Sequence, residues 1–187
     1  VRRLDRLITD ISDASRLDAE LSRAETALVD LGAMLATLVQ MRGDTASLPA
    51  AGGQPLFRLD TVVGQELTVD GVESRLVQVF SNLMANAASF SPPGSVVTLR
   101  AVRDGDLVRV EVDDEGPGIP AGKEEAVFER FYSERPEGEA FGTHSGLGLS
   151  ISRQIVEVHG GTITAENRRS ERDGATGTRF TVRLPAM

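Results

Sequence analysis

The sequence predicts an α/β sandwich (α+β), in which helices cover one face of a mixed, mainly antiparallel sheet and a further helix precedes them. Segments with the period of an amphipathic helix are interspersed with short segments that alternate apolar and polar residues, as half-buried strands do. Neighbouring strand patterns are joined by short polar turns, which favours antiparallel pairing over parallel strands with helical crossovers. With 187 residues, the chain can form one or two domains.

The first quarter of the chain carries two helical patterns. In residues 1–26, apolar residues recur at helical spacing between charges. Such a stripe must be buried, either on the chain's own domain or in a helical hairpin or dimeric bundle. The chain begins at Val1 inside this pattern, which indicates a piece of a longer polypeptide. A second helix is predicted over 27–42, and the Gly-, Ala-, Ser- and Pro-rich residues 43–55 predict a loop.

The middle of the chain alternates between strand and helix patterns. Short strands are predicted over 57–59 and 66–69. A helix over 71–89 has its large apolar side chains on one face. Two further strands, 96–102 and 107–112, flank a polar turn and form a hairpin.

The last third of the chain completes the sandwich. A short helix is predicted within 120–132 and an aperiodic loop over 133–145. A helix over 147–159 ends at two glycines, which is a strong stop signal. The closing strands are 162–167 and 178–184.

Composition and charge exclude several functions. The net charge of -8 and a pI of about 4.8 argue against nucleic-acid binding, which normally uses a basic face. The absence of cysteine excludes disulfides, thiolate catalysis and zinc–thiolate sites. The sequence has no apolar run of the roughly 20 residues that cross a bilayer, and no signal peptide is visible.

Two asparagines on the predicted 71–89 helix are candidate metal ligands. Asn82 and Asn86 are one turn apart and therefore share a face. Amide oxygens suit a hard cation such as Mg²⁺ that phosphates already neutralise, because they add no charge. The alternative is that Asn86 only hydrogen-bonds a neighbouring loop.

A carboxylate after the strand 107–112 is a candidate for recognising a base. Asp114 can accept a hydrogen bond from an exocyclic amine such as that of adenine, and Gly116 and Gly118 allow the backbone to pass close to a flat ring. An ordinary Asp-Gly turn is the alternative. The spacing leaves open which of Asp113, Asp114 and Glu115 points inward.

A glycine-rich run precedes the predicted 147–159 helix. Its members are Gly142, Thr143, His144, Ser145, Gly146, Leu147 and Gly148. Free N–H groups and the positive end of the helix dipole would face a phosphate there. The sequence has no Gly-Lys-Ser/Thr and no parallel βαβ unit around the run, so this is neither a P-loop nor a dinucleotide fingerprint.

Aromatic residues and histidines have structural interpretations. Phe128 and Phe131 are three apart and are expected to share a helical face, with Phe128 in the core. Tyr132, beside the 133–145 loop, is a candidate to cover a nucleotide. His159 is expected to act at a helix end, where the dipole favours a positive ring. His144 lies in the glycine-rich run, near the expected phosphate site.

In their order along the chain, these motifs resemble the N, G1, F and G2 boxes of bacterial two-component sensor histidine kinases. The resemblance covers about residues 55–185. Residues 1–26 look like the second helix of the dimerisation and phosphoacceptor hairpin, and 27–187 like the ATP-binding catalytic domain of the GHKL (Bergerat) type. Segments 86–92 and 134–142 are similar to the ChvG/ExoS group of envelope-stress sensors.

The resemblance implies three helices on a mixed five-stranded sheet, with ATP and Mg²⁺ bound under a lid formed by 133–145. It implies that Asn86 ligates Mg²⁺ with Asn82 nearby, and that Asp114 receives the adenine amine between Gly116 and Gly118. The other residues that it places at the nucleotide are Ile119, Arg130, Tyr132, Arg135, Thr143, His144, Ser145, Gly146, Leu147, Gly148 and Thr178.

Three departures from the family pattern matter. The phosphoacceptor histidine and its acidic neighbour are absent, so we expect no catalytic residue for self-phosphorylation and no autophosphorylation in isolation. A Lys or Arg that often follows the metal-ligating asparagine by three residues is Ser89 here. The Arg that often follows Tyr132 is Ser133, with Arg130 and Arg135 as candidate replacements.

The resemblance implies the cytoplasmic portion of an inner-membrane sensor kinase, homodimeric at full length. Such a protein transfers the γ-phosphoryl group of ATP to a histidine of its own phosphoacceptor bundle, and then to an aspartate of a response regulator. Two alternatives remain open. The first is another GHKL ATPase or a serine kinase, and the second is a non-catalytic module for nucleotide sensing or docking.

Overall fold

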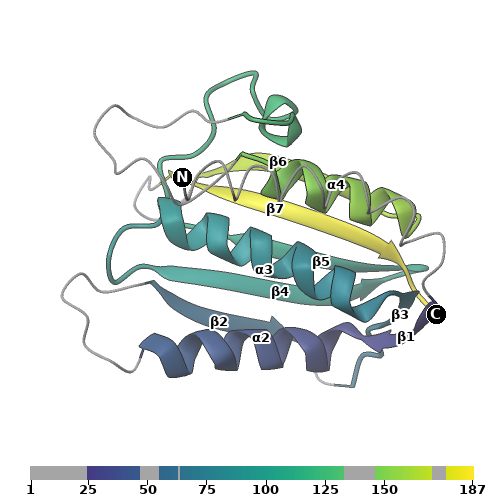
Figure 1. The fold of residues 1–187 in the computed structure, drawn as a ribbon. Coiled ribbons are helices and arrows are strands. Elements are labelled where there is room, and N and C mark those ends of the chain that lie inside the picture. Colours follow the sequence, from purple (N-terminus) through teal and green to yellow (C-terminus); the bar gives the residue numbers. More distant parts are fainter. Residues whose placement is uncertain (1–24, 47–54, 63, 133–145, 170–175) are drawn as a thin grey trace, which may run out of the picture.

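The computed structural model describes residues 25–46, 55–62, 64–132, 146–169 and 176–187. These residues form two layers, a five-stranded sheet and three α-helices that cover one of its faces (Figure 1). The predicted fold class is therefore confirmed. Of the helix expected over 1–26, residues 1–24 lie outside the described residues, and residues 25 and 26 are not helical. The lid expected over 133–145 also lies outside the described residues. No helix of the described part is long and apolar enough to span a membrane.

The sheet is mixed, and its strand order is β2-β4-β5-β7-β6. Its only parallel pair within the described part is β2 with β4, and the other three pairs are antiparallel. The strands are β2 (Leu56–Thr61), β4 (Val96–Asp104), β5 (Leu107–Asp113), β6 (Thr162–Arg169) and β7 (Thr176–Pro185). These five strands were predicted, and each extends beyond the predicted bounds. The strand predicted over 66–69 is present but shifted by two residues, to 68–71.

Three helices lie on one face of the sheet, in the order α2, α3, α4 across Figure 1. They are α2 (Leu31–Ala46), α3 (Glu73–Phe90) and α4 (Gly148–Val158). The helices α3 and α4 match the predicted periods, while α2 continues to Ala46, beyond the predicted end at residue 42. A small second sheet pairs β1 (Ala27–Asp30) with β3 (Thr68–Gly71).

The prediction of helix for residues 27–30 is wrong. These residues form β1, with Leu28 exposed and Val29 buried, as strand alternation requires. The helix begins only at Leu31, because Oδ1 of Asp30 accepts a hydrogen bond from the Ala33 N–H at 3.0 Å. A carboxylate in this N-cap geometry satisfies a free amide of the first turn and fixes where the helix starts.

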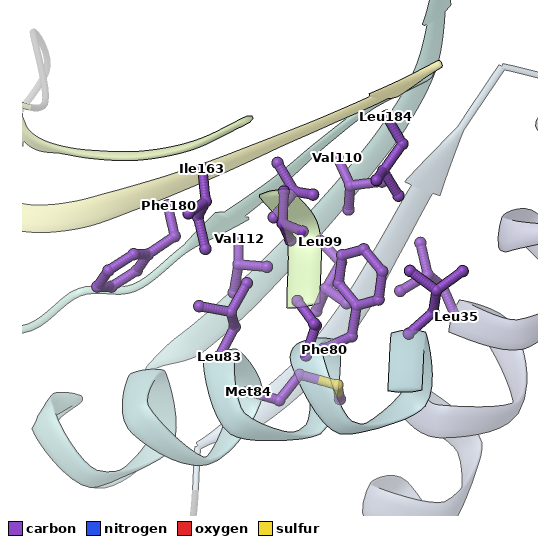
Figure 2. Close-up of a cluster of buried hydrophobic side chains, with 14 of the residues drawn as sticks. Leu35, Phe80, Leu83, Met84, Leu99, Val110, Val112, Ile163, Phe180 and Leu184 are labelled. Carbon is purple, nitrogen blue, oxygen red and sulfur yellow. The ribbon is translucent and has the colours of Figure 1, made fainter. Parts of the chain in front are cut away.

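The hydrophobic core fills the space between the helices and the sheet (Figure 2). From the helices come Leu35, Phe80, Leu83 and Met84, and from the strands come Leu99, Val110, Val112, Ile163, Phe180 and Leu184. All of these side chains are at most 4% exposed. Burial of this apolar surface is the main contribution that holds α3 on the centre of the sheet.

The opposite face of the sheet carries a network of arginines and carboxylates. On β5, Glu111 and Asp113 are buried although they point away from the helices. Arg179 donates from Nε and from one terminal nitrogen to the two oxygens of Asp113, at 2.7 and 2.8 Å. Arg100 and Arg109 pair with Glu111. The hydrogen bond with Asp113 raises the pKa of Arg179, so its guanidinium stays charged.

The short helix predicted within 120–132 is a single 3₁₀ turn, η1 (Ala126–Phe128). Phe128 is buried and meets the Phe180 ring edge to face at 6.1 Å, so its predicted place in the core is confirmed. Phe131 is 55% exposed and has a left-handed backbone with φ of 65°. The prediction that Phe128 and Phe131 share a helical face is wrong, because the turn ends between them.

Candidate functional site

Asp114 is held in a fixed orientation at the end of β5. Its backbone N–H donates to the Thr178 carbonyl at 2.9 Å, and its Oδ1 accepts from the N–H groups of Thr178 and Gly116 at 2.9 and 2.8 Å. The side chain is 2% exposed. Burial raises the pKa of Asp114, and the hydrogen bonds from Thr178 and Gly116 partly offset this rise.

The structure distinguishes the three neighbouring carboxylates. Asp113 is bound by Arg179 on the open face of the sheet. Glu115 is exposed. Asp114 alone among them is bound to Thr178 and Gly116. The inward carboxylate that the spacing left undetermined is therefore Asp114.

Gly116 and Gly118 are required by close approaches of the protein to itself. A Cβ at Gly116 would lie 2.9 Å from the Phe90 carbonyl oxygen at the end of α3. Gly118 has φ of 85°, and a Cβ there would lie 2.6 Å from Oδ1 of Asn167. We expected these glycines to allow close approach to a ring. The described contacts show that they fit the loop between α3 and β6.

Asn82 joins two helices. Its Nδ2 donates to the Gly148 carbonyl at 3.2 Å and to Oγ of Ser152 at 3.3 Å. These bonds attach α3 to the first turns of α4. Asn82 therefore positions the start of α4, and its amide nitrogen is already engaged.

Asn86 is placed between the two glycine loops. One turn before it, Asn82 contacts Gly148, and one turn after it, Phe90 contacts Gly116. Within the described residues, the side chain of Asn86 has no hydrogen-bond partner. Beyond the hydrogen bonds of the helix, its backbone oxygen accepts from Oγ of Ser89 at 3.0 Å. Its amide oxygen is thus suitable as a ligand.

The start of α4 is held by Phe131 and Tyr132. The Phe131 N–H donates to the Gly146 carbonyl at 3.0 Å, and a Cβ at Gly146 would lie 3.0 Å from the Tyr132 carbonyl oxygen. Leu147 is buried, and the next residues of the first turn are half-buried. The N-cap residue makes no side-chain capping bond among the described residues. The first-turn N–H groups can therefore meet an anion.

The remaining predicted site residues fall into two groups. Thr178 lies against Asp114, Ile119 is half-buried, Arg130 is exposed, and Tyr132 packs against the core. The other predicted residues, Arg135, Thr143, His144 and Ser145, lie outside the described residues. Arg130 makes no contact that identifies it as a replacement for the missing arginine.

His159 has a structural role, but not as a positive charge. Its Nε2 accepts a hydrogen bond from the Val72 N–H at 3.0 Å, and Nδ1 lies 2.7 Å from the Ile155 carbonyl, to which it donates. A nitrogen that accepts from an N–H carries no proton, so the ring is neutral. The expected stabilisation of a positive ring by the dipole of α4 is therefore wrong. The ring instead connects the end of α4 to the start of α3.

Three residues that support Asp114 were missed by sequence reasoning. Asn167 bonds Ile119, Arg168 donates to the Asp114 carbonyl at 3.3 Å, and a Cβ at Gly177 would lie 2.1 Å from the same carbonyl oxygen. They belong to β6 and β7 and meet the loop only through the sheet register. No local motif identifies them.

The part of the chain that the structure describes contributes few metal ligands. The described residues contain no group of three or more His, Cys, Asp or Glu side chains that could hold a metal ion. An ion at Asn86 would therefore take most of its oxygens from phosphates and water, as Mg²⁺ bound with a nucleotide does.

The fold and these features together define a nucleotide-binding ATPase domain. Three helices cover one face of a mixed sheet, a buried carboxylate follows a central strand, and α4 begins without a side-chain cap among the described residues. Residues 71–187 match the family described as histidine kinase-, DNA gyrase B- and HSP90-like ATPases. The chain belongs to this family.

Similar proteins narrow the class to sensor histidine kinases. The sensor protein ChvG of Rhizobium meliloti is 48% identical over 193 residues, which cover 100% of this chain and 33% of that protein. Full-length ShkA in complex with AMPPNP has a TM-score of 0.73 at 26% identity, covering 97% of this chain and 35% of ShkA. The histidine kinase ThkA in complex with the response regulator TrrA has a TM-score of 0.69 at 25% identity, covering 98% and 48%. The chain is a domain homologous to histidine kinase catalytic domains and spans about a third of ChvG.

Proposed function

We propose that this domain binds ATP with Mg²⁺ and supplies it to a histidine on a phosphoacceptor bundle of the same, longer protein. The observation that carries the proposal is the buried Asp114, oriented at the end of β5 by the N–H groups of Thr178 and Gly116. A fixed acceptor for the base amine and free N–H groups for the phosphates are the two ends of a nucleotide site.

Each group in the site has a proposed role. Asp114 accepts from the adenine amine, and the first turn of α4 with Gly146 and Gly148 binds phosphate oxygens. Asn86 supplies one oxygen to Mg²⁺, which would neutralise phosphate charge during phosphoryl transfer. Asn82 positions α4 for this purpose. The residues 133–145 are proposed as the lid.

The proposal extends to the full-length protein. Its phosphate acceptor would be a bundle histidine and then a response-regulator aspartate, in a homodimeric sensor whose cytoplasmic part includes this domain. The support is the similarity to ChvG, named a sensor protein, and to ThkA, which was solved with the regulator TrrA.

The site can be tested by calorimetry with ATP and Mg²⁺. Asn86→Ala should abolish Mg²⁺-dependent ATP binding and leave the unfolding temperature unchanged, because the amide is not used in folding contacts among the described residues. Gln78→Ala, two turns earlier on α3, is the matched control and should retain binding. Unchanged ATP affinity of Asn86→Ala would contradict the metal assignment.

A further inference from the structure

A side chain outside the recognised motifs holds the loop that follows Asp114. Oδ1 of Asn167 accepts from the Ile119 N–H at 2.6 Å, and Nδ2 of Asn167 donates to the Ile119 carbonyl at 2.7 Å. Both backbone groups of one residue are thus bound by one side-chain amide. The amide takes the place that a neighbouring strand would occupy in a sheet.

The sheet register places this contact beside the support of Asp114. Asn167 on β6 is the cross-strand partner of Thr178 on β7. Thr178 holds Asp114 at the start of the loop, and Asn167 holds Ile119 at its end. Two paired residues therefore fix both ends of the segment 114–119.

The loop is also shaped to fit Asn167. Gly118 adopts φ of 85°, which favours glycine, and a Cβ there would lie 2.6 Å from Oδ1 of Asn167. Asn167 is exposed, so its amide could bond water instead. It bonds the loop backbone at both ends of its amide, which fixes the position of Ile119 relative to Asp114.

We propose that Asn167 is a positioning residue that makes this site selective for adenine over guanine. The inference rests on the proposed nucleotide-binding function. Adenine presents an amine to Asp114, whereas guanine presents a carbonyl oxygen at the same position, which a carboxylate repels. That difference discriminates only if the base cannot shift, because a movable loop lets guanine avoid the carboxylate. Asn167 prevents this movement by tying Ile119 to β6.

The test compares ATP and GTP binding to the full chain by calorimetry with Mg²⁺. Asn167→Ala should lower the affinity for ATP about tenfold and lower the affinity for GTP much less. The ratio of ATP affinity to GTP affinity should therefore fall. Asn167→Asp keeps the acceptor for the Ile119 N–H and loses the donor, and should give an intermediate ratio. Thr164→Ala, an exposed position on the same strand, is the matched control and should leave the ratio unchanged.

Hydrogen exchange supplies an independent readout. The Ile119 amide should exchange faster in Asn167→Ala, while the amides of the β5–β7 pair keep their protection. Because Asn167 is exposed, both variants should fold. If Asn167→Ala does not fold, the near-isosteric Asn167→Asp decides the outcome.

The outcomes distinguish a failure of the proposed function from a failure of the proposed role of Asn167. If the unmodified chain binds no ATP, the proposed function fails, and the inference with it. If it binds ATP and the Asn167 variants keep its ATP-to-GTP ratio, only the role of Asn167 is overturned. Equal weakening of ATP and GTP with a lower unfolding temperature would show a purely structural residue, which also overturns the inference.

Discussion

At the scale of a single residue, Asp114 is subject to two opposing effects on its pKa, burial and hydrogen bonding. Burial raises its pKa above the ordinary value of 3.8, and the hydrogen bonds of Thr178 and Gly116 only partly offset this. A carboxyl with a raised folded pKa adds stability below its unfolded pKa and loses that contribution as the pH rises through the folded value. Once ionised, the buried side chain therefore lowers the free energy of unfolding.

Asp114→Asn should separate binding from stability. An amide nitrogen facing the adenine amine replaces an acceptor with a donor, so ATP affinity should fall by about 1–3 kcal/mol. The amide oxygen can still accept from Thr178 and Gly116. We therefore expect the variant without nucleotide to be as stable as the parent or more stable. The free energy of unfolding of the variant minus that of the parent, both measured by urea denaturation, should increase from about pH 4 to about pH 7.

Asp113→Asn is the matched comparison for the adjacent carboxylate. It replaces one of the two oxygens that accept from Arg179 with an NH2 group and removes the negative charge. The free energy of unfolding should therefore fall by about 1–3 kcal/mol, while ATP affinity stays unchanged. If both variants lose ATP binding equally, or if Asp114→Asn weakens GTP as much as ATP, Asp114 is not the residue that reads the base.

At the scale of elements, the helices and strands that sequence predicts are those whose apolar pattern and turn residues lie within the element itself. The helices α3 and α4 carry continuous apolar stripes, and the β4–β5 hairpin has its own turn, so sequence alone predicts them. The strand β1 was missed because it has four residues and pairs only with the distant β3. Its Leu28 also fits the apolar period of the helix that follows, which made a longer helix the expected result.

The ring of His159 connects the end of α4 to the start of α3. His159→Leu removes the acceptor of the Val72 N–H and the donor to Ile155, leaving a partly buried amide without that partner. The free energy of unfolding should fall by about 1–2 kcal/mol. ATP affinity should be retained, because His159 lies at the opposite end of α4 from Gly148.

Glu157→Gln, an exposed position in the same turn, should be neutral in the same denaturation experiment. A variant at His159 that keeps full stability and loses phosphoryl transfer would contradict the structural role.

At the scale of the whole molecule, the site divides into parts that sequence reveals and parts that it does not. Asn86, Asp114 and the glycines before α4 lie in short motifs, where residue type and spacing indicate the chemistry. Their support comes from Asn167 and Gly177, which reach the loop through the pairing of β6 with β7. Asn167 and Ile119 are 48 residues apart in sequence, so only the folded sheet brings them together.

This domain is proposed to bind ATP, while a separate bundle carries the histidine that accepts the phosphoryl group. Incubated with labelled ATP, the chain alone should acquire no acid-labile phosphate. Its only imidazoles are His144 and His159, and neither is followed directly in the sequence by an acidic residue that could act as a base. His159, in addition, has both ring nitrogens engaged.

Mixed with a separate dimeric bundle that carries the phosphoacceptor helix, the chain should label that bundle slowly. The rate should be low and should rise with bundle concentration, because the covalent connection that gives a high effective concentration is missing. Asn86→Ala should abolish this transfer, and Gln78→Ala should retain it. A chain that binds ATP but labels no bundle at any concentration would favour the non-catalytic nucleotide-sensing module, and stoichiometric labelling of His144 or His159 would overturn the division of labour itself.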